Sequence, residues 1–452
     1  MSLLSNASFT IKKYTVYIAL AGPYPKDPVS ALGHVFLVIA PANSEAPFLN
    51  WMAINFAADT ENATWYNYYI KGASGSFNAY YYTLSVHEKI MEYVGSETRD
   101  IRFFPLEISE KEYHKLEKNL SDWSETPYHY KFFTYNCADG IYYLLYSSLN
   151  SLPPPTIKIM APQDVVLILQ KENRLGDPYL LSSLRERVLS ATDKEQAELE
   201  FLEWENSQKT AVKDILREKR MAELRYSISQ KSNKERRDLF KLEESWTKPH
   251  GYSRLDIGPQ IIDGKINTHI RFRPLLHDPS DNSGYYSAYS TLELLSFGLN
   301  LNNTGINLQE FTLLHIRSAP IYDSIFRSLS WDVFVSYKHG IHKLNLGIGK
   351  SFYVSEKRKI ALELLLLNSI KYDDNFSNFT GFESQLNKRL VDDFRYGVKF
   401  EYLHRLTNFE NKHIQFTKWI SYDVNRNFNL YAEVIFDIKK QKIIGLYSRF
   451  YI

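Results

Sequence analysis

The chain has 452 residues, a formal net charge of +2 and a single cysteine. The near-neutral charge excludes the basic excess of a nucleic-acid-binding protein, and one cysteine excludes an intramolecular disulfide and any multi-cysteine metal site. No stretch reaches the roughly eighteen consecutive apolar residues of a transmembrane helix. The length predicts two or three domains.

Residues 1–165 alternate short strands with helical stretches, which predicts an α+β domain. Residues 15–21 and 34–40 are apolar runs typical of buried strands, and residues 110–123 have the 3.6-residue period of a helix. The prolines at 153–155 are expected to close this domain. The run at 15–21 is too short and too far inside the chain for a signal peptide, so any export signal is expected upstream of residue 1.

Residues 166–247 are rich in Glu, Lys, Arg, Ala and Leu, with almost no Gly or Pro. Such a composition favours one or two long, solvated helices. We therefore expect a helical spacer between the N-terminal domain and the rest of the chain.

From residue 248 to residue 452 the hydrophobic period changes to two. At 429–438, for example, Leu430, Val434 and Phe436 share one face. We expect roughly twelve antiparallel strands here, separated by turn-forming stretches such as 277–284 and 372–381. A soluble sandwich would usually use shorter strands, whereas a transmembrane barrel needs long ones, with apolar side chains towards lipid and polar ones in the lumen.

Four charged residues at lumen-type positions favour the barrel: Arg395, Lys399, Glu401 and Arg449. The last residues of the chain, 442–452, alternate and end on aromatic and apolar residues, as the final strands of outer-membrane barrels do. We therefore predict that 248–452 form an outer-membrane β-barrel.

The lone cysteine, Cys137, stands at the start of an apolar helical stretch. Backbone N–H groups and the helix dipole favour a thiolate there, and a thiolate nucleophile needs a base. His34, which opens an apolar strand after a glycine, is the candidate base. A histidine at a strand edge followed by a cysteine at a helix start is a papain-like pair in circularly permuted order. The alternative is that Cys137 is a small buried hydrophobic residue.

Three further residues are candidates for the site. Asn55 could orient the His34 imidazole, or it could be an ordinary strand asparagine. Asn136 could supply an oxyanion donor, although capping of the Cys137 helix is favoured. Tyr135 is expected to pack around the site.

Two other charged pairs are interpreted as structural. Arg99 and Asp100 are expected to form an ion pair rather than to act in catalysis. His277 and Asp278 suggest a metal site, but two ligands are too few, and a barrel-rim turn is favoured. We therefore expect no metal and no cofactor.

Several stretches of residues 28–170 resemble the Lnb N-terminal periplasmic domain family, in the branch joined to a barrel. The resemblance rests on "PVSALGHVFLVI", "AINFAAD", "YYIKGASGSFNAYYY", "ETRDIRFFPLEISEKEYHKL", "YHYKFFTYNCADGIYYLL" and "APQDVV". Beyond the spacer, "KPHGYSRLDIG" and "FRPLLHDPSDNSGYYSAYSTLEL" resemble the barrel that follows in those proteins. The family name comes from a lipoprotein N-acyltransferase, which implies catalytic roles for His34 and Cys137. That named member has membrane helices rather than a barrel, so its reaction need not transfer.

Three functions are compatible with the sequence. The first is a cysteine acyltransferase or acyl hydrolase acting on phospholipid and lipoprotein through an acyl-thioester. The second is a cysteine peptidase or amidase of the envelope, and the third is a non-enzymatic channel with a periplasmic adaptor. In each case the chain is expected in the outer membrane, in contact with its lipid, with the N-terminal domain in the periplasm and without a nucleic-acid partner.

Overall fold

The computed structural model divides the chain into two compact units, residues 1–24 with 32–246, and 25–31 with 247–452. It describes residues 14–24, 30, 32–41, 51–60, 71–72, 74–132, 134–155, 160–185, 198–199, 202–203, 220–221, 223–224, 240–242, 250–282, 289–302, 305–322, 327–338, 340–355, 360–373, 375–391, 393–406, 408–437 and 442–452. Within these ranges, the helices are all too short or too polar to cross a bilayer.

The N-terminal unit is built on an antiparallel sheet with the strand order β6-β4-β3-β2-β1-β5-β7-β8. Its strands are β1 (Tyr14–Ala21), β2 (His34–Pro41), β3 (Met52–Ala58), β4 (Phe77–Ser85), β5 (Ile101–Pro105), β6 (Tyr128–Tyr130), β7 (Tyr179–Leu181) and β8 (Phe240–Leu242). The apolar runs that predicted strands at 15–21 and 34–40 are β1 and β2, which pair along their whole length.

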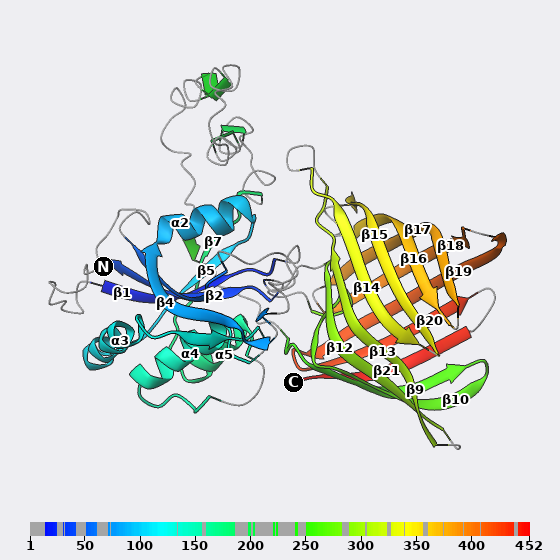
Figure 1. Cartoon of the computed structure of the whole chain (residues 1–452), viewed down its shortest axis with the longest axis horizontal. Coiled ribbons are helices and arrows are strands. Elements are labelled where there is room, and N and C mark those ends of the chain that lie inside the picture. Colours follow the sequence, from blue (N-terminus) through cyan, green and yellow to red (C-terminus); the bar gives the residue numbers. More distant parts are fainter. Residues whose placement is uncertain are drawn as a thin grey trace. The chain divides into compact units, whose positions relative to one another are not determined.

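Helices lie on both faces of this sheet (Figure 1). They are α2 (Val86–Ile90), which continues into the π-helix η2 (Met91–Ser96), and α3 (Glu110–Trp123), α4 (Cys137–Ser148) and α5 (Pro162–Lys171). In Figure 1 α2 lies above the sheet, and α3, α4 and α5 lie below it. Sheet and helices together confirm the predicted α+β class.

The N-terminal unit extends beyond the expected boundary at residue 165. Helix α5 runs through that boundary, with Val165, Val166 and Leu169 fully buried. Strand β7 pairs with β5, and its Leu181 belongs to the same core as Phe36 and Phe103. The prolines at 153–155 therefore sit in a connection between α4 and α5, inside the unit.

Most of the expected helical spacer lies outside the described residues. Residues 198–199, 202–203, 220–221 and 223–224 are helical. Leu199, Met221 and Leu224 form a small core there. Strand β8, at 240–242, adds extended structure to a range that was expected to be entirely helical.

In the C-terminal unit, twelve of the described strands form a closed antiparallel barrel. They are β9 (Arg254–Ile262), β10 (Lys265–Arg273), β12 (Thr291–Asn302), β13 (Gly305–Ser318), β14 (Ser330–Lys338), β15 (Ile341–Ser355), β16 (Ile360–Tyr372), β17 (Phe376–Val391), β18 (Phe394–Arg405), β19 (Asn408–Asn425), β20 (Phe428–Asp437) and β21 (Lys442–Tyr451). Pairing of β21 with β9 and of β10 with β12 closes the ring. A short strand, β11 (Leu275–His277), also pairs with β12.

The barrel is apolar outside and polar inside. Leu346, Leu366 and Leu446 are 46%, 69% and 58% exposed, while Arg317 and Glu383 are buried. This distribution is the reverse of that in a soluble protein, and lipid is the solvent that it suits. The predicted barrel of roughly twelve strands is therefore confirmed, with Arg395, Glu401 and Arg449 among the buried polar residues.

Candidate active site

Strands β2 and β3 and helix α4 bring the candidate residues of the N-terminal unit together. His34 is the first residue of β2 and follows Gly33, whose φ of 92° favours glycine. Asn55 lies in β3, and Cys137 is the first residue of α4. The prediction that Cys137 opens a helix is confirmed.

A chain of hydrogen bonds connects His34 to β4. His34 Nε2 lies 3.1 Å from Asn55 Oδ1, and Asn55 Nδ2 donates to Tyr82 Oη over 3.2 Å. With its amide nitrogen committed to Tyr82, Asn55 presents an oxygen to the imidazole, so Nε2 carries the proton. The neutral ring then has its lone pair on Nδ1, as a general base requires.

The surroundings of His34 keep its ring neutral. The imidazole is half-buried and lies near two aromatic rings. Its ring centre is 5.7 Å from that of Tyr93 and 6.2 Å from that of Phe36. Burial lowers the pKa of His34 to about 3, and the cations Lys89 and Arg99 contribute in the same direction. At neutral pH the ring is therefore an unprotonated base.

The sulfur of Cys137 lies beside the start of β2. The backbone N–H groups of Val35, the residue after His34, of Ala138 and of Cys137 itself lie near enough to favour the thiolate form of this sulfur. The hydroxyl of Tyr82 is close enough for Cys137 to contribute to its raised pKa. Cys137 thus lies against the start of β2, the strand that His34 opens.

The expected thiolate at Cys137 is corrected by the structure. Only 6% of this residue is exposed, and burial raises the pKa of its thiol to about 11. The three N–H groups oppose that change, but desolvation outweighs them, and Asp139 adds to the rise. Cys137 therefore rests as a thiol.

Asn136 makes the capping interactions of α4. Its Oδ1 accepts from the N–H groups of Ala138 and Asp139, and Asp139 accepts in return from the N–H of Asn136. Its Nδ2 donates to the carbonyls of Phe132 and Met160. Because both ends of the amide are engaged, the side chain serves as a cap rather than as an oxyanion donor.

Close contact between α4 and β3 fixes the position of the first turn of α4, which carries Cys137, against the sheet. A Cβ on Gly140 would come within 2.3 Å of the Phe56 ring, so only glycine allows this approach. The Gly140 carbonyl also accepts a hydrogen bond of 2.7 Å from Tyr81. These contacts set the first turn of α4 against the sheet.

Aromatic side chains gather around the start of α4. Tyr135 packs edge-on against Phe56 and lies within 5.6 Å of Tyr143, in the packing role expected for it. Tyr82 and Tyr143 are 41% and 38% exposed. Part of the aromatic surface of β4 and α4 therefore reaches solvent.

Arg99 and Asp100 do not form the ion pair that was expected. Arg99 pairs with Glu97 and donates to the Gly22 carbonyl over 3.0 Å. Asp100 instead accepts from the backbone N–H of Ser183 over 2.7 Å. The difference arises because the Arg99 side chain lies over the Tyr93 ring, with its guanidinium carbon 4.4 Å from the ring centre.

His277 has a histidine neighbour from a distant part of the sequence. His250 Nε2 lies 3.1 Å from His277 Nδ1, and Asp281 completes a potential three-ligand group. The rings are nearly parallel, at 14°, with centroids 5.4 Å apart. The two ring nitrogens can share one N–H···N hydrogen bond, and together with Asp281 they form a buried group that could hold a metal ion. The structure thus adds two candidate ligands, His250 and Asp281, to His277, where the sequence offered only His277 and Asp278.

The sequence analysis missed Tyr82 and the cations near His34. Tyr82 stands directly opposite Asn55 in the β3–β4 register, which only the strand pairing reveals. Lys89 approaches through α2, and its Nζ lies 4.9 Å from the centre of the Tyr93 ring. The alternation of side chains along β4 could have assigned Tyr82 to one face of the sheet. It could not have shown that Asn55 is its hydrogen-bond partner.

Comparisons with known proteins agree with this division of the chain. Residues 6–166 match the family model of the Lnb N-terminal periplasmic domain, and residues 243–443 match a domain of unknown function, DUF7840. The comparison with curated proteins found no match.

Solved structures similar to this chain include outer-membrane porins and channels. The KdgM porin is 13% identical, covering 44% of this chain and 99% of its own, with a TM-score of 0.28. The NanC porin is 9% identical, with coverages of 44% and 100% and a TM-score of 0.31. An outer membrane channel from Pseudomonas putida F1 is 12% identical, with coverages of 46% and 99% and a TM-score of 0.28. The chain thus joins an Lnb N-terminal periplasmic domain to a twelve-strand outer-membrane β-barrel, with the N-terminal domain in the periplasm.

Proposed function

We propose that the N-terminal domain is a cysteine acyltransferase or acyl hydrolase with a permuted papain-like site. Cys137 is the nucleophile, His34 the general base, and Asn55 the residue that positions the imidazole. The observation that carries this proposal is the His34–Asn55–Tyr82 hydrogen-bond chain, with the buried Cys137 against the start of the strand that His34 opens. A cysteine in an ordinary core would not need a base with a fixed tautomer next to it.

The resting pair is neutral, which defines how the reaction begins. As Cys137 Sγ attacks the carbonyl carbon of an ester, its proton moves to the lone pair of His34 Nδ1. The imidazolium then protonates the leaving alcohol, which gives an acyl-thioester and a lysophospholipid. An amine or water attacks the thioester, and the thiol is restored as the amide or the free acid leaves.

The aromatic border of the site favours a lipid donor. Tyr82, which bonds to Asn55, and Tyr143 of α4 each expose more than a third of their surface. Tyrosine rings are amphipathic and suit the boundary between lipid and water. The barrel keeps the domain at the outer membrane, where phospholipid is its most abundant ester, and a lipoprotein amino terminus could serve as the acceptor.

A second candidate is a cysteine peptidase or amidase of the envelope. The same three side chains could attack an amide, because a neutral thiol–imidazole pair can deliver the proton that an amine leaving group requires. The two candidates share the nucleophile and differ in the bond that they break.

The test is to incubate the full chain, in detergent, with phospholipid and to measure both its intact mass and the release of lysophospholipid. We expect one acyl chain on Cys137, removable by hydroxylamine, and lysophospholipid as the second product. Both should vanish in Cys137→Ala and decrease strongly in His34→Ala. The matched control is His129→Ala, which replaces an exposed histidine of β6.

Two results would contradict the acyltransfer proposal. One is the absence of both adduct and lysophospholipid from a chain whose barrel is folded. The other is cleavage of envelope peptides that depends on Cys137 while phospholipid is left intact, which would favour the amidase.

A further inference from the structure

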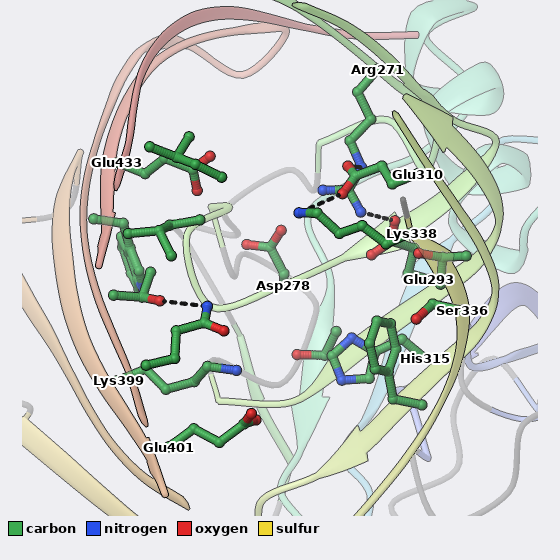
Figure 2. A pocket seen from close by; sticks show the side chains of 18 of the residues that line it. Arg271, Asp278, Glu293, Glu310, His315, Ser336, Lys338, Lys399, Glu401 and Glu433 are labelled. Carbon is green, nitrogen blue, oxygen red and sulfur yellow. Dashed lines mark hydrogen bonds and ion pairs between the residues drawn. The ribbon is translucent and has the colours of Figure 1, made fainter. Parts of the chain in front are cut away.

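The lumen of the barrel contains a cavity of about 720 Å³ with a polar wall (Figure 2). Its lining combines acidic and basic side chains from opposite strands, such as Glu310 and Lys399. Asp278 appears in the middle of this ring of side chains in Figure 2, although it belongs to no barrel strand. One segment of the chain therefore enters the lumen.

That segment follows strand β11. The β10–β12 and β11–β12 pairings have the same register, with Phe272 opposite Phe297 and Leu275 opposite Leu294. Strand β11 is thus a continuation of β10 beyond Pro274, along the edge of β12. It lies at the barrel end where β9 begins and β21 finishes, because Leu276 donates to the Tyr252 carbonyl.

Residues 278–281, with the sequence DPSD, form a turn held by its own side chains. The N–H of Asp278 donates to Asp281 Oδ2 over 2.8 Å, and the N–H of Asp281 donates to the Asp278 carbonyl over 2.9 Å. The N–H of Ser280 donates to Asp278 Oδ1 over 2.8 Å. Proline at the second position and aspartate at the first favour such a turn. We call this segment the DPSD turn.

The near side of the barrel wall holds the two carboxylates of the DPSD turn. Asp281 pairs with Arg254 of β9 and accepts from the Tyr451 hydroxyl of β21 over 2.6 Å. Asp278 accepts from Arg273 of β10 over 3.1 Å. All three strands are adjacent in the sheet.

The far side of the wall holds the middle of the turn. The Ser280 carbonyl accepts from Arg395 of β18 over 3.2 Å and from Ser421 of β19 over 2.6 Å. On the near side, the Ser280 hydroxyl also accepts from Arg449 of β21 over 2.7 Å. Four strands separate β10 from β18 in the ring of twelve, so these two strands lie nearly opposite each other. The DPSD turn therefore bridges the lumen.

Burial makes these contacts rigid. Ser280, Asp281, Arg254, Arg395 and Arg449 are each less than 5% exposed. Leaving one partner of a buried ion pair without its counter-charge is strongly unfavourable, so the turn cannot swing aside without a large loss of stability. Asp278 and Pro279 face the cavity and form its floor.

We propose that the DPSD turn is a fixed plug that closes the periplasmic end of the barrel. The N-terminal domain is periplasmic, and the chain enters the barrel at the end that the turn occupies. The lumen is then a blind cavity that extends from the turn towards Lys338 and Asp437 at the opposite end. The barrel serves as an anchor and does not conduct ions between the two sides of the membrane.

The experiment measures ion conductance of the purified full chain in planar lipid bilayers, with heat modifiability on gels as the test of folding. The wild-type chain should show no conductance steps. A variant that combines Asp278→Gly, Ser280→Gly and Asp281→Gly removes the side-chain hydrogen bonds and ion pairs of the turn and leaves only the Ser280 carbonyl contacts, so the turn should move and open conductance steps should appear. Lys338→Ala, in the wall at the opposite end, should behave as wild type.

Two outcomes would overturn the plug. One is conductance of the wild-type chain at the level of the triple variant, and the other is a triple variant that is folded but does not conduct. The triple variant leaves buried arginines without partners, which could unfold the barrel. A second test therefore uses the wild-type chain alone. Liposomes containing it should not swell in an isotonic solution of a small sugar, and swelling would likewise contradict a sealed lumen.

Discussion

The candidate site and the barrel lumen both bury polar side chains, but they do so in opposite ways. Around Cys137 the buried groups that would react are neutral, and burial moves the pKa of His34 downward and that of the thiol upward. In the lumen the buried groups are charged and paired, as where Arg317 contacts Asp332 and Glu383. Burial without a counter-charge keeps a group neutral and able to react, whereas burial with one fixes its geometry.

The largest expected effect concerns the nucleophile. Cys137→Ala and Cys137→Ser should each reduce acyl-enzyme formation and lysophospholipid release by about a thousandfold or more, because no other thiol exists in the chain. The barrel should still fold, since the substitution lies in the other unit. Mass spectrometry and heat modifiability, measured on the same preparation, check both statements. Activity that survives either substitution would exclude the proposed nucleophile.

A substitution in the barrel lumen should lower the stability of the barrel rather than the activity of the N-terminal domain. Arg317→Ala leaves three carboxylates, those of Asp332, Glu363 and Glu383, without their shared cation. We expect a loss of about 3–5 kcal/mol in the free energy of unfolding, measured from urea titrations of the folded barrel on unheated gels. Lys338→Ala is the control, since that side chain is 43% exposed and its pairing with Glu310 contributes little.

A smaller effect is expected when the imidazole loses its orientation. Asn55→Ala removes the acceptor of His34 Nε2 and should slow acylation by about 10–100-fold. Tyr82→Phe removes only the hydroxyl that holds the Asn55 amide, and should slow it less. The alkylation rate of Cys137 at several pH values separates positioning from a merely structural role. An unchanged pH profile in Asn55→Ala would argue against the positioning role.

The last effect, comparable in size to that of Asn55→Ala, is a dependence of stability on pH. The pKa of His34 is about 3 in the folded domain, against an ordinary value of 6.5. Between those values the unfolded chain binds a proton that the folded domain does not, so stability should fall as the pH drops below about 6.5. For this half-buried ring the loss should be about 2 kcal/mol after solvent screening. Hydrogen exchange in β2 measures it, and His34→Gln should remove most of the dependence.

The barrel could be predicted from the sequence because a strand between lipid and a polar lumen must alternate apolar and polar residues. Lipid outside and polar groups inside force an alternation along each strand, and residues such as Leu430 and Leu446 keep it without long-range information. The helix start at Cys137 could also be predicted from neighbouring residues alone. Asn136 and Asp139, three residues apart, form a capping box there.

Features that depend on long-range register could not be predicted. Tyr82 acquires its role only through pairing with β3, and Ser280 meets Arg395 across the lumen, 115 positions along the chain. The raised pKa of the Cys137 thiol could not be predicted, because desolvation outweighs the N–H groups that favour a thiolate at a helix start. Desolvation is a property of the packed domain and leaves no local signal.

The burial of Cys137 also affects how readily its thiol is oxidised in the periplasm. The periplasm is oxidising, and disulfide exchange and peroxide oxidation both proceed through the thiolate. A thiol with a pKa near 11 carries roughly a hundredfold less thiolate at neutral pH than one with the ordinary value of 9. The desolvation that keeps Cys137 as a thiol therefore protects this solitary cysteine from oxidation.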